Sequence, residues 1–262
     1  MRQRGLRSTS ILFFGAIIGV TSSAGARVAE PIRSGSIIAV AFSPDGKFLV
    51  SAGVGSPLRL WDPTTGKEVR QLAKQSAWFG SAVFSPDGKY VAATEQDSTI
   101  KLFDVQGKDA PRTLGHHPES DVLTYNPLTF TPDGKTLASG GAKAIVLWNV
   151  AEAKEIARME LAGRLEGAIA FSPDGKRIAS AEAGGVVKLW DIATAKETRA
   201  LQHLQFCYSV AFAPDGKTLV SGGSDRGNGG GRVKVWEADT GKQIHSLSAT
   251  DRPLMSVAFS PD

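Results

Sequence analysis

The sequence has little cysteine and little histidine, and these shortages exclude several kinds of site. Among 262 residues there is one cysteine, Cys207, so the chain has no internal disulfide and no multi-cysteine metal site. Of the four histidines, His116 and His117 are adjacent rather than spaced as shared ligands, and we expect no metal and no other cofactor. Cys207 is expected to be a small buried residue rather than a nucleophile.

Acidic residues are absent from residues 1–26, which contain Arg2, Arg4 and Arg7. An apolar run from Ile11 to Val20 follows, and then Ala24-Gly25-Ala26. This order is typical of a secretory signal, so we expect cleavage after Ala26 and an exported product, periplasmic or secreted. An uncleaved anchor is the alternative, but the run is shorter than the roughly 20 residues that span a bilayer, and we expect no membrane span in the mature chain.

Basic residues are otherwise scarcely in excess, because the formal net charge of +4 comes mainly from these three arginines. The remaining chain is nearly neutral, so its charge gives no indication of a nucleic-acid partner. Hydrophobic residues make up 42% and charged residues 21% of the sequence, which is the balance of a folded globular protein.

Self-comparison shows a repeat of 41 to 47 residues. Phe42-Ser43-Pro44-Asp45-Gly46-Lys47 recurs with small changes from Phe84, Phe130, Phe171 and Phe212, and its first four positions recur from Phe259. A second marker follows the first five copies in phase: Leu60-Trp61-Asp62, Leu102-Phe103-Asp104, Leu147-Trp148-Asn149, Leu189-Trp190-Asp191 and Val235-Trp236-Glu237.

Each repeat predicts a four-stranded antiparallel meander, which we label a to d along the chain. In residues 208–248, strand a ends at Phe212 and Ala213-Pro214-Asp215-Gly216 reverses the chain, with glycine at the position of positive φ. Strand b, the alternating strand c around Trp236, a turn at 239–242 and strand d follow. Such a thin sheet cannot bury both faces alone, so neighbouring sheets must stack.

The two markers together resemble those of the WD-repeat β-propeller family. The resemblance implies an all-β fold of five complete four-stranded blades and the first strand of a sixth, with a parent propeller of commonly seven blades. Residues 1–26 would be the signal peptide, 27–34 a linker or closing strand, and 35–262 the propeller, incomplete at its C-terminus. The Gly-His signature is weak, since it is matched by Gly115-His116 and in part by His203.

The family resemblance also implies a hydrogen-bonded tetrad of Trp, Ser or Thr, His and Asp in a blade. The fifth repeat offers Trp236, Ser221, His203 and Asp225, whereas the second offers only Thr94 and Asp97, with Phe103 in place of Trp. We therefore expect most blades to lack the tetrad and to be held by apolar packing.

Length variation falls in the d-to-a and b-to-c loops, which emerge on one side of a meander, and such loops usually carry binding specificity. We expect the partner surface there; the alternative for Trp78 and Phe206 is that they fill gaps between blades. The candidate partner-binding residues are Trp78, Phe79, His116, His117, Arg164, Phe206, Asp225, Arg226 and Arg252.

Catalysis is not expected, because the strand a segments carry no carboxylate, histidine or lysine. Gly134-Lys135-Thr136 and Gly216-Lys217-Thr218 precede strands, so they are turns rather than phosphate-binding loops. We therefore expect a non-catalytic protein-interaction scaffold. The alternatives are the recognition domain of a larger secreted enzyme or carrier, with its chemistry beyond residue 262, and a propeller that is itself an enzyme.

Overall fold

The computed structural model describes residues 10–12, 35–74, 78–117, 127–225 and 230–260. All regular elements within these ranges are β-strands, which confirms the all-β fold. No helix in this part of the chain is long and apolar enough to cross a bilayer. Residues 27–34, Arg226 and the final Pro261-Asp262 lie outside the described residues.

The strands form five four-stranded sheets in which each strand pairs with the next along the chain, as the repeat predicts. Sheet 1 contains β2 (Ser36–Phe42), β3 (Leu49–Val54), β4 (Ser56–Trp61) and β5 (Glu68–Ala73); sheet 2 contains β6 (Phe79–Phe84), β7 (Tyr90–Glu95), β8 (Thr99–Asp104) and β9 (Arg112–His116). Sheet 3 contains β10 (Leu128–Phe130), β11 (Thr136–Gly140), β12 (Ala144–Asn149) and β13 (Lys154–Glu160). Sheet 4 contains β14 (Leu165–Phe171), β15 (Arg177–Glu182), β16 (Val186–Asp191) and β17 (Lys196–Gln202). Sheet 5 contains β18 (Phe206–Phe212), β19 (Thr218–Ser224), β20 (Gly231–Glu237) and β21 (Gln243–Ser248).

A further short strand, β1 (Ser10–Leu12), pairs antiparallel with β2 of sheet 1. This strand comes from the segment that the sequence assigns to the apolar part of a signal peptide. The rest of residues 1–26 lies outside the described residues, and the signal peptide and its cleavage stay predictions.

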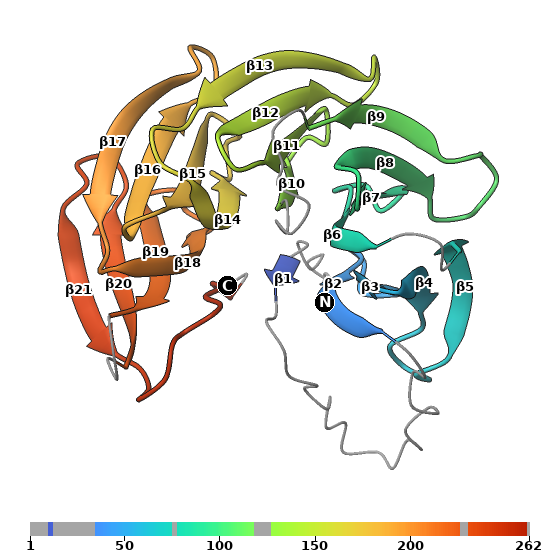
Figure 1. Cartoon of the computed structure of the whole chain (residues 1–262), viewed down its shortest axis with the longest axis horizontal. Coiled ribbons are helices and arrows are strands. Elements are labelled where there is room, and N and C mark those ends of the chain that lie inside the picture. Colours follow the sequence, from blue (N-terminus) through green and yellow to red (C-terminus); the bar gives the residue numbers. More distant parts are fainter. Residues whose placement is uncertain (1–9, 13–34, 75–77, 118–126, 226–229, 261–262) are drawn as a thin grey trace, which may run out of the picture. The chain divides into compact units, whose positions relative to one another are not determined.

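The chain divides into two compact units. Unit 1, residues 1–116, contains sheets 1 and 2, and unit 2, residues 117–262, contains sheets 3, 4 and 5. The first strands of consecutive sheets lie side by side within a unit: β2 beside β6 in unit 1, and β10, β14 and β18 in unit 2 (Figure 1).

The a-to-b turn has the hydrogen bonds that its sequence predicts. In sheet 1 the Ser43 hydroxyl donates to Asp45 Oδ1 over 2.7 Å, and the Lys47 amide donates to the same oxygen over 3.1 Å. Gly46 has a φ of 71°, a conformation that glycine adopts without strain. The hydrogen bond from Ser43 holds the pKa of Asp45 below its ordinary value. The same turn recurs at Ser85, Thr131 and Ser172.

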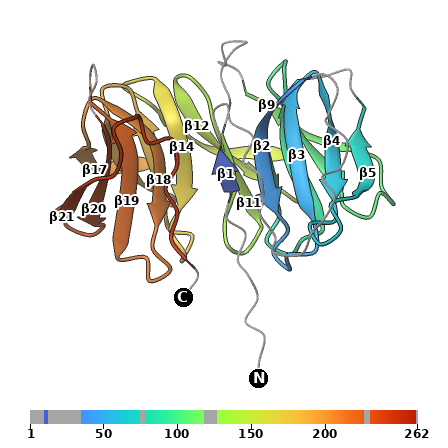
Figure 2. The same ribbon diagram turned by 90° about the horizontal axis from the view of Figure 1, so that it is seen from below.

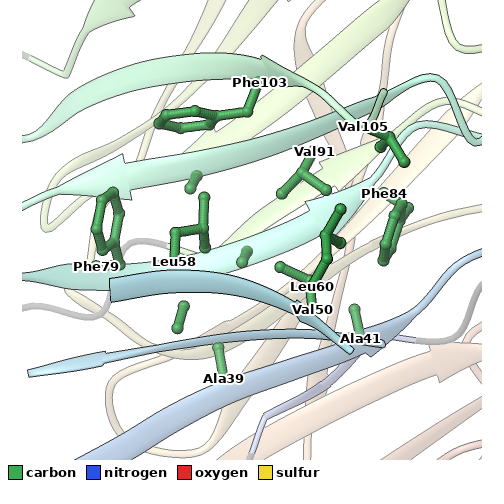
Figure 3. Packing of buried hydrophobic residues seen from close by; sticks show 13 residues of the cluster. Ala39, Ala41, Val50, Leu58, Leu60, Phe79, Phe84, Val91, Phe103 and Val105 are labelled. Carbon is green, nitrogen blue, oxygen red and sulfur yellow. The ribbon is translucent and has the colours of Figure 1, made fainter. Parts of the chain in front are cut away.

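Consecutive sheets bury one another's apolar faces. In unit 1, Leu58 and Leu60 of β4 and Phe79 and Phe84 of β6 belong to one buried cluster (Figure 3). The Phe79 and Phe103 rings meet edge to face, with centroids 6.3 Å apart. In unit 2 the clusters join sheet 3 to sheet 4 and sheet 4 to sheet 5. This stacking is what a thin four-stranded sheet requires.

The outer strand of four sheets carries a β-bulge opposite the tryptophan position of strand c. The pairing shifts between Leu147 and Trp148, for example, so that Ile156 of β13 has no partner in the register. Ile156 is 53% exposed. The equivalent bulged residues are Val69, Thr198 and Ile244.

The first strand of the sixth repeat is present only as an extended segment, because no strand is assigned between residues 249 and 260. The Val257 amide donates to Ser209 Oγ over 3.1 Å, and a side chain at Gly222 would lie 2.6 Å from Val257. This segment therefore lies against sheet 5 (Figure 2) without joining a sheet ladder.

Candidate interaction surface

A hydrogen bond between tryptophan and serine links strands c and b in four of the five sheets. The indole Nε1 donates to the serine hydroxyl over 2.8 to 3.0 Å in the pairs Trp61–Ser51, Trp148–Ser139, Trp190–Ser180 and Trp236–Ser221. The serine lies two residues after the residue that pairs with the tryptophan; Leu219, for instance, pairs with Trp236. The expectation that apolar packing alone holds most sheets was therefore too narrow.

Sheet 5 extends this pair with a histidine. His203 Nδ1 lies 2.8 Å from Ser221 Oγ, and His203 is 1% exposed. Because Ser221 accepts a hydrogen bond from Trp236, its own hydroxyl proton is available to donate to Nδ1. Burial, assisted by the nearby Lys234, lowers the pKa of His203 to about 4, while Asp225 acts in the opposite direction. Of the tetrad that the family resemblance implies, Trp236 and His203 therefore contact Ser221 directly, and Asp225 acts on the pKa of His203.

Sheet 2 differs from its expected arrangement by one residue. Phe103 pairs with Val91, so the position equivalent to serine is Ala93 and not Thr94. Thr94 lies on the opposite face of β7, and its buried hydroxyl has no hydrogen-bond partner among the described residues. Sheet 2 therefore lacks both members of the tryptophan–serine pair.

The buried histidine at the start of unit 2 is His117, whereas His116 is exposed. From the sequence, Gly115-His116 is expected to be the Gly-His signature. His116 ends β9, and the position directly after strand d, which His203 occupies after β17, falls on His117. The ring of His117 occupies the space beside Gly141, where an added Cβ would lie 2.1 Å from its Cε1.

The nine candidate partner-binding residues separate by exposure. Phe79 and His117 are 0% exposed, so they are core residues in this structure and we leave them out of the surface. Arg226 lies outside the described residues. Within unit 1, Trp78 is 39% exposed and His116 is exposed. Within unit 2, Arg164, Asp225 and Arg252 are exposed and Phe206 is partly exposed.

Three of these residues come together at one end of sheet 5. Phe206 pairs with Ser224, which precedes Asp225 and also pairs with Gly231. A side chain at Gly231 would lie 2.6 Å from the Arg252 carbonyl oxygen. The rings of Phe206 and Tyr208 are stacked, with centroids 6.0 Å apart. We call Phe206, Asp225 and Arg252 the sheet 5 rim; it combines an aromatic ring with charges of both signs.

Cys207 is the one cysteine of the sequence, and the structure places it in the core. Cys207 is buried, and burial raises the pKa of its thiol to about 12, as expected for a small core residue. No three of the described His, Cys, Asp and Glu residues gather as metal ligands would.

Comparison with known proteins decides the family. The pattern described as "WD domain, G-beta repeat" matches five segments that together cover more than half of the chain: residues 30–62, 66–104, 110–149, 167–191 and 196–237. The chain belongs to the WD-repeat family. Each matched segment ends on or just after strand c of one of the five sheets, so these sheets are the blades of this WD-repeat protein.

A curated relative is an uncharacterized WD repeat-containing protein of Nostoc sp., which is 40% identical to this WD-repeat chain over 47 residues. The match covers 18% of the chain and 3% of the relative's length. This similarity therefore concerns about one repeat.

Proposed function

We propose that this WD-repeat protein is an exported, non-catalytic scaffold that binds a protein partner through the sheet 5 rim and through Arg164 in the loop before β14. WD-repeat domains generally mediate protein interactions, so membership of the WD-repeat family supports a role in protein binding. The observation that supports the specific surface is the meeting of Phe206, Asp225 and Arg252 at the end of sheet 5 where the variable loops emerge.

The composition of the rim fits a protein partner. Aromatic residues and arginine are the usual energetic anchors of protein interfaces, and charges of opposite sign fix the orientation of a partner. Phe206 is partly exposed on strand a, so a partner can cover it without unfolding the sheet. Trp78 of unit 1 is a separate exposed aromatic residue with the same potential.

A capture experiment tests both the surface and the export. The tagged protein is expressed from Met1 and recovered from the exported fraction, where its N-terminus is expected to be Arg27. Arg252→Glu should reduce partner capture by about tenfold or more, because a reversed charge at a rim opposes the partner's complementary charge. Lys217→Glu is the matched control, since Lys217 is exposed in the a-to-b turn at the opposite end of sheet 5.

Two results would contradict the proposal. Equal capture by the Arg252→Glu variant and the wild-type protein would remove the rim from the interface. An exported protein that still begins at Met1 would refute cleavage.

A further inference from the structure

The residue that directly follows strand d of one sheet lies against the next sheet, and its identity varies. His203 follows β17 of sheet 4 and contacts Ser221 of sheet 5, and His117, which follows β9, lies against Gly141 beside the end of β11 in sheet 3. The residue two positions after the strand b serine is glycine in both sheets, namely Gly141 and Gly223. At Gly141 a larger side chain would occupy the space of the histidine ring.

Sheet 4 has a different pair of residues at these two positions. Leu161 follows β13, strand d of sheet 3, and Glu182 stands two residues after Ser180 in β15 of sheet 4. Trp190 donates to Ser180 Oγ over 3.0 Å, and Ser180 donates to Glu182 Oε1, also over 3.0 Å. The chain of hydrogen bonds that ends on a histidine in sheet 5 therefore ends on a carboxylate in sheet 4.

The Glu182 side chain is almost completely buried, with 1% exposure, and the cation beside it is Lys188. Lys188 Nζ lies 3.5 Å from Glu182 Oε2 and 2.9 Å from Glu197 Oε2. Burial raises the pKa of Glu182, while Ser180 and Lys188 oppose that rise. The strand β18, which packs against β15, carries no Asp, Glu, Lys, Arg or His; its titratable groups are Cys207 and Tyr208.

Glu182 also lies beneath the loop of residues 161–164, which carries the exposed Arg164. A Cβ at Gly163 would lie 3.6 Å from Glu182 Oε2, and the Gly163 amide lowers the pKa of the Glu182 carboxyl. The Ala183 amide donates to the Arg164 carbonyl over 2.7 Å. At its other end the loop is held by the Leu161 amide, which donates to the Lys143 carbonyl over 2.7 Å.

We propose that Glu182 is the positioning residue of the 161–164 loop and takes the place that histidine occupies in sheets 3 and 5. Sheet 2 has a related arrangement, in which Lys74 follows β5, strand d of sheet 1, and Glu95 Oε2 of β7 lies 2.7 Å from Lys101 Nζ. The inference depends on the proposed function only where it concerns partner binding by Arg164. How well the 161–164 loop is ordered can be measured without a partner.

Hydrogen exchange of the Leu161 and Ala183 amides measures the loop directly, since both amides are hydrogen-bonded there. Glu182→Gly removes the carboxylate and should raise their exchange rates by about tenfold, as expected for a lost hydrogen bond to a charged group. Adding Leu161→His to Glu182→Gly recreates the residue pair of sheets 3 and 5 and should restore most of the protection. Glu197→Gln is the control, because Glu197 contacts Lys188 and not Ser180.

The Leu161→His/Glu182→Gly variant tests whether a histidine can replace Glu182 in positioning the 161–164 loop. If Leu161→His/Glu182→Gly exchanges as fast as Glu182→Gly, or if Glu182→Gly exchanges as slowly as the wild type, the positioning role is refuted. Should Glu182→Gly fail to fold, the isosteric Glu182→Gln takes its place. Because burial raises the pKa of Glu182, wild-type loop protection should then fall as the pH is lowered through that pKa, while that of Glu182→Gln stays flat, and equal pH profiles would refute the role.

Partner capture is a separate readout. Failure of Arg164→Ala to weaken capture would count against Arg164 in the proposed interface and would leave the exchange results unaffected.

Discussion

His203 is a buried base that the fold keeps neutral. Its pKa is lowered from 6.5 to about 4, so between these two pH values the unfolded chain binds a proton that the folded chain does not. The free energy of unfolding should consequently fall as the pH decreases from 6.5 to 4, by on the order of 3 kcal/mol, and then level off.

Urea unfolding of the wild type and of His203→Gln between pH 7 and 4 checks this, because the variant has no group that titrates at this position. The raised pKa of Glu182 acts in the opposite direction, so the difference between the two proteins is the relevant quantity. His245→Gln is the matched control on the exposed strand β21. Parallel curves for wild type and His203→Gln would show that His203 is not held neutral.

The pairing of β7 with β8 in sheet 2 provides a direct test of the tryptophan–serine hydrogen bond. Both partners are missing there, because Ala93 and Phe103 occupy their positions. Ala93→Ser alone buries an unpaired hydroxyl, and Phe103→Trp alone buries an unpaired indole N–H, so each should lower the free energy of unfolding by about 1–3 kcal/mol.

The double variant should recover about 1 kcal/mol or more relative to the sum of the single changes, since the two new groups can then bond to each other. Denaturant unfolding of the four proteins gives the coupling energy. Thr94→Ser/Phe103→Trp serves as the control, because Thr94 lies on the other face of β7. Additive effects in the Ala93→Ser/Phe103→Trp protein would contradict the register argument.

The sequence predicts the elements better than it predicts single positions within them. The turn chemistry and the phase of the tryptophans determine the four strands of each repeat, because few other structures accommodate Ser-Pro-Asp-Gly followed by an alternating strand. Thr94 was misplaced because the residue count between strands b and c varies and a shift of one residue reverses the face. His117 was confused with His116 because no side chain marks the end of β9. The sequence did not single out Glu182, because a buried carboxylate has no motif. The position two residues after the strand b serine or its equivalent nevertheless alternates between Gly and Glu along the repeats: Gly53, Glu95, Gly141, Glu182 and Gly223.

At the scale of the whole molecule, the sheets within each unit bury one another's apolar faces. Sheet 5 is covered by the extended segment of residues 249–260 rather than by a sheet. Leu254→Ala/Val257→Ala should therefore lower the free energy of unfolding of unit 2 by about 1–3 kcal/mol, a modest loss because both side chains are only partly buried.

Hydrogen exchange of the sheet 5 amides checks this result within unit 2 alone. Ala258→Ser, at an exposed position of the same segment, is the control. Unchanged protection of β19 in the double variant would show that the segment does not stabilise the sheet.

The bulges on the outer strands affect how readily two molecules can pair through their exposed strand edges. A straight, unpaired strand edge is a template for further strands, and proteins built from many short sheets present many such edges. Here Val69, Ile156 and Ile244 interrupt the hydrogen-bonding line of β5, β13 and β21 at the same place. We therefore expect these edges to be poor templates for a strand of a second molecule over their full length.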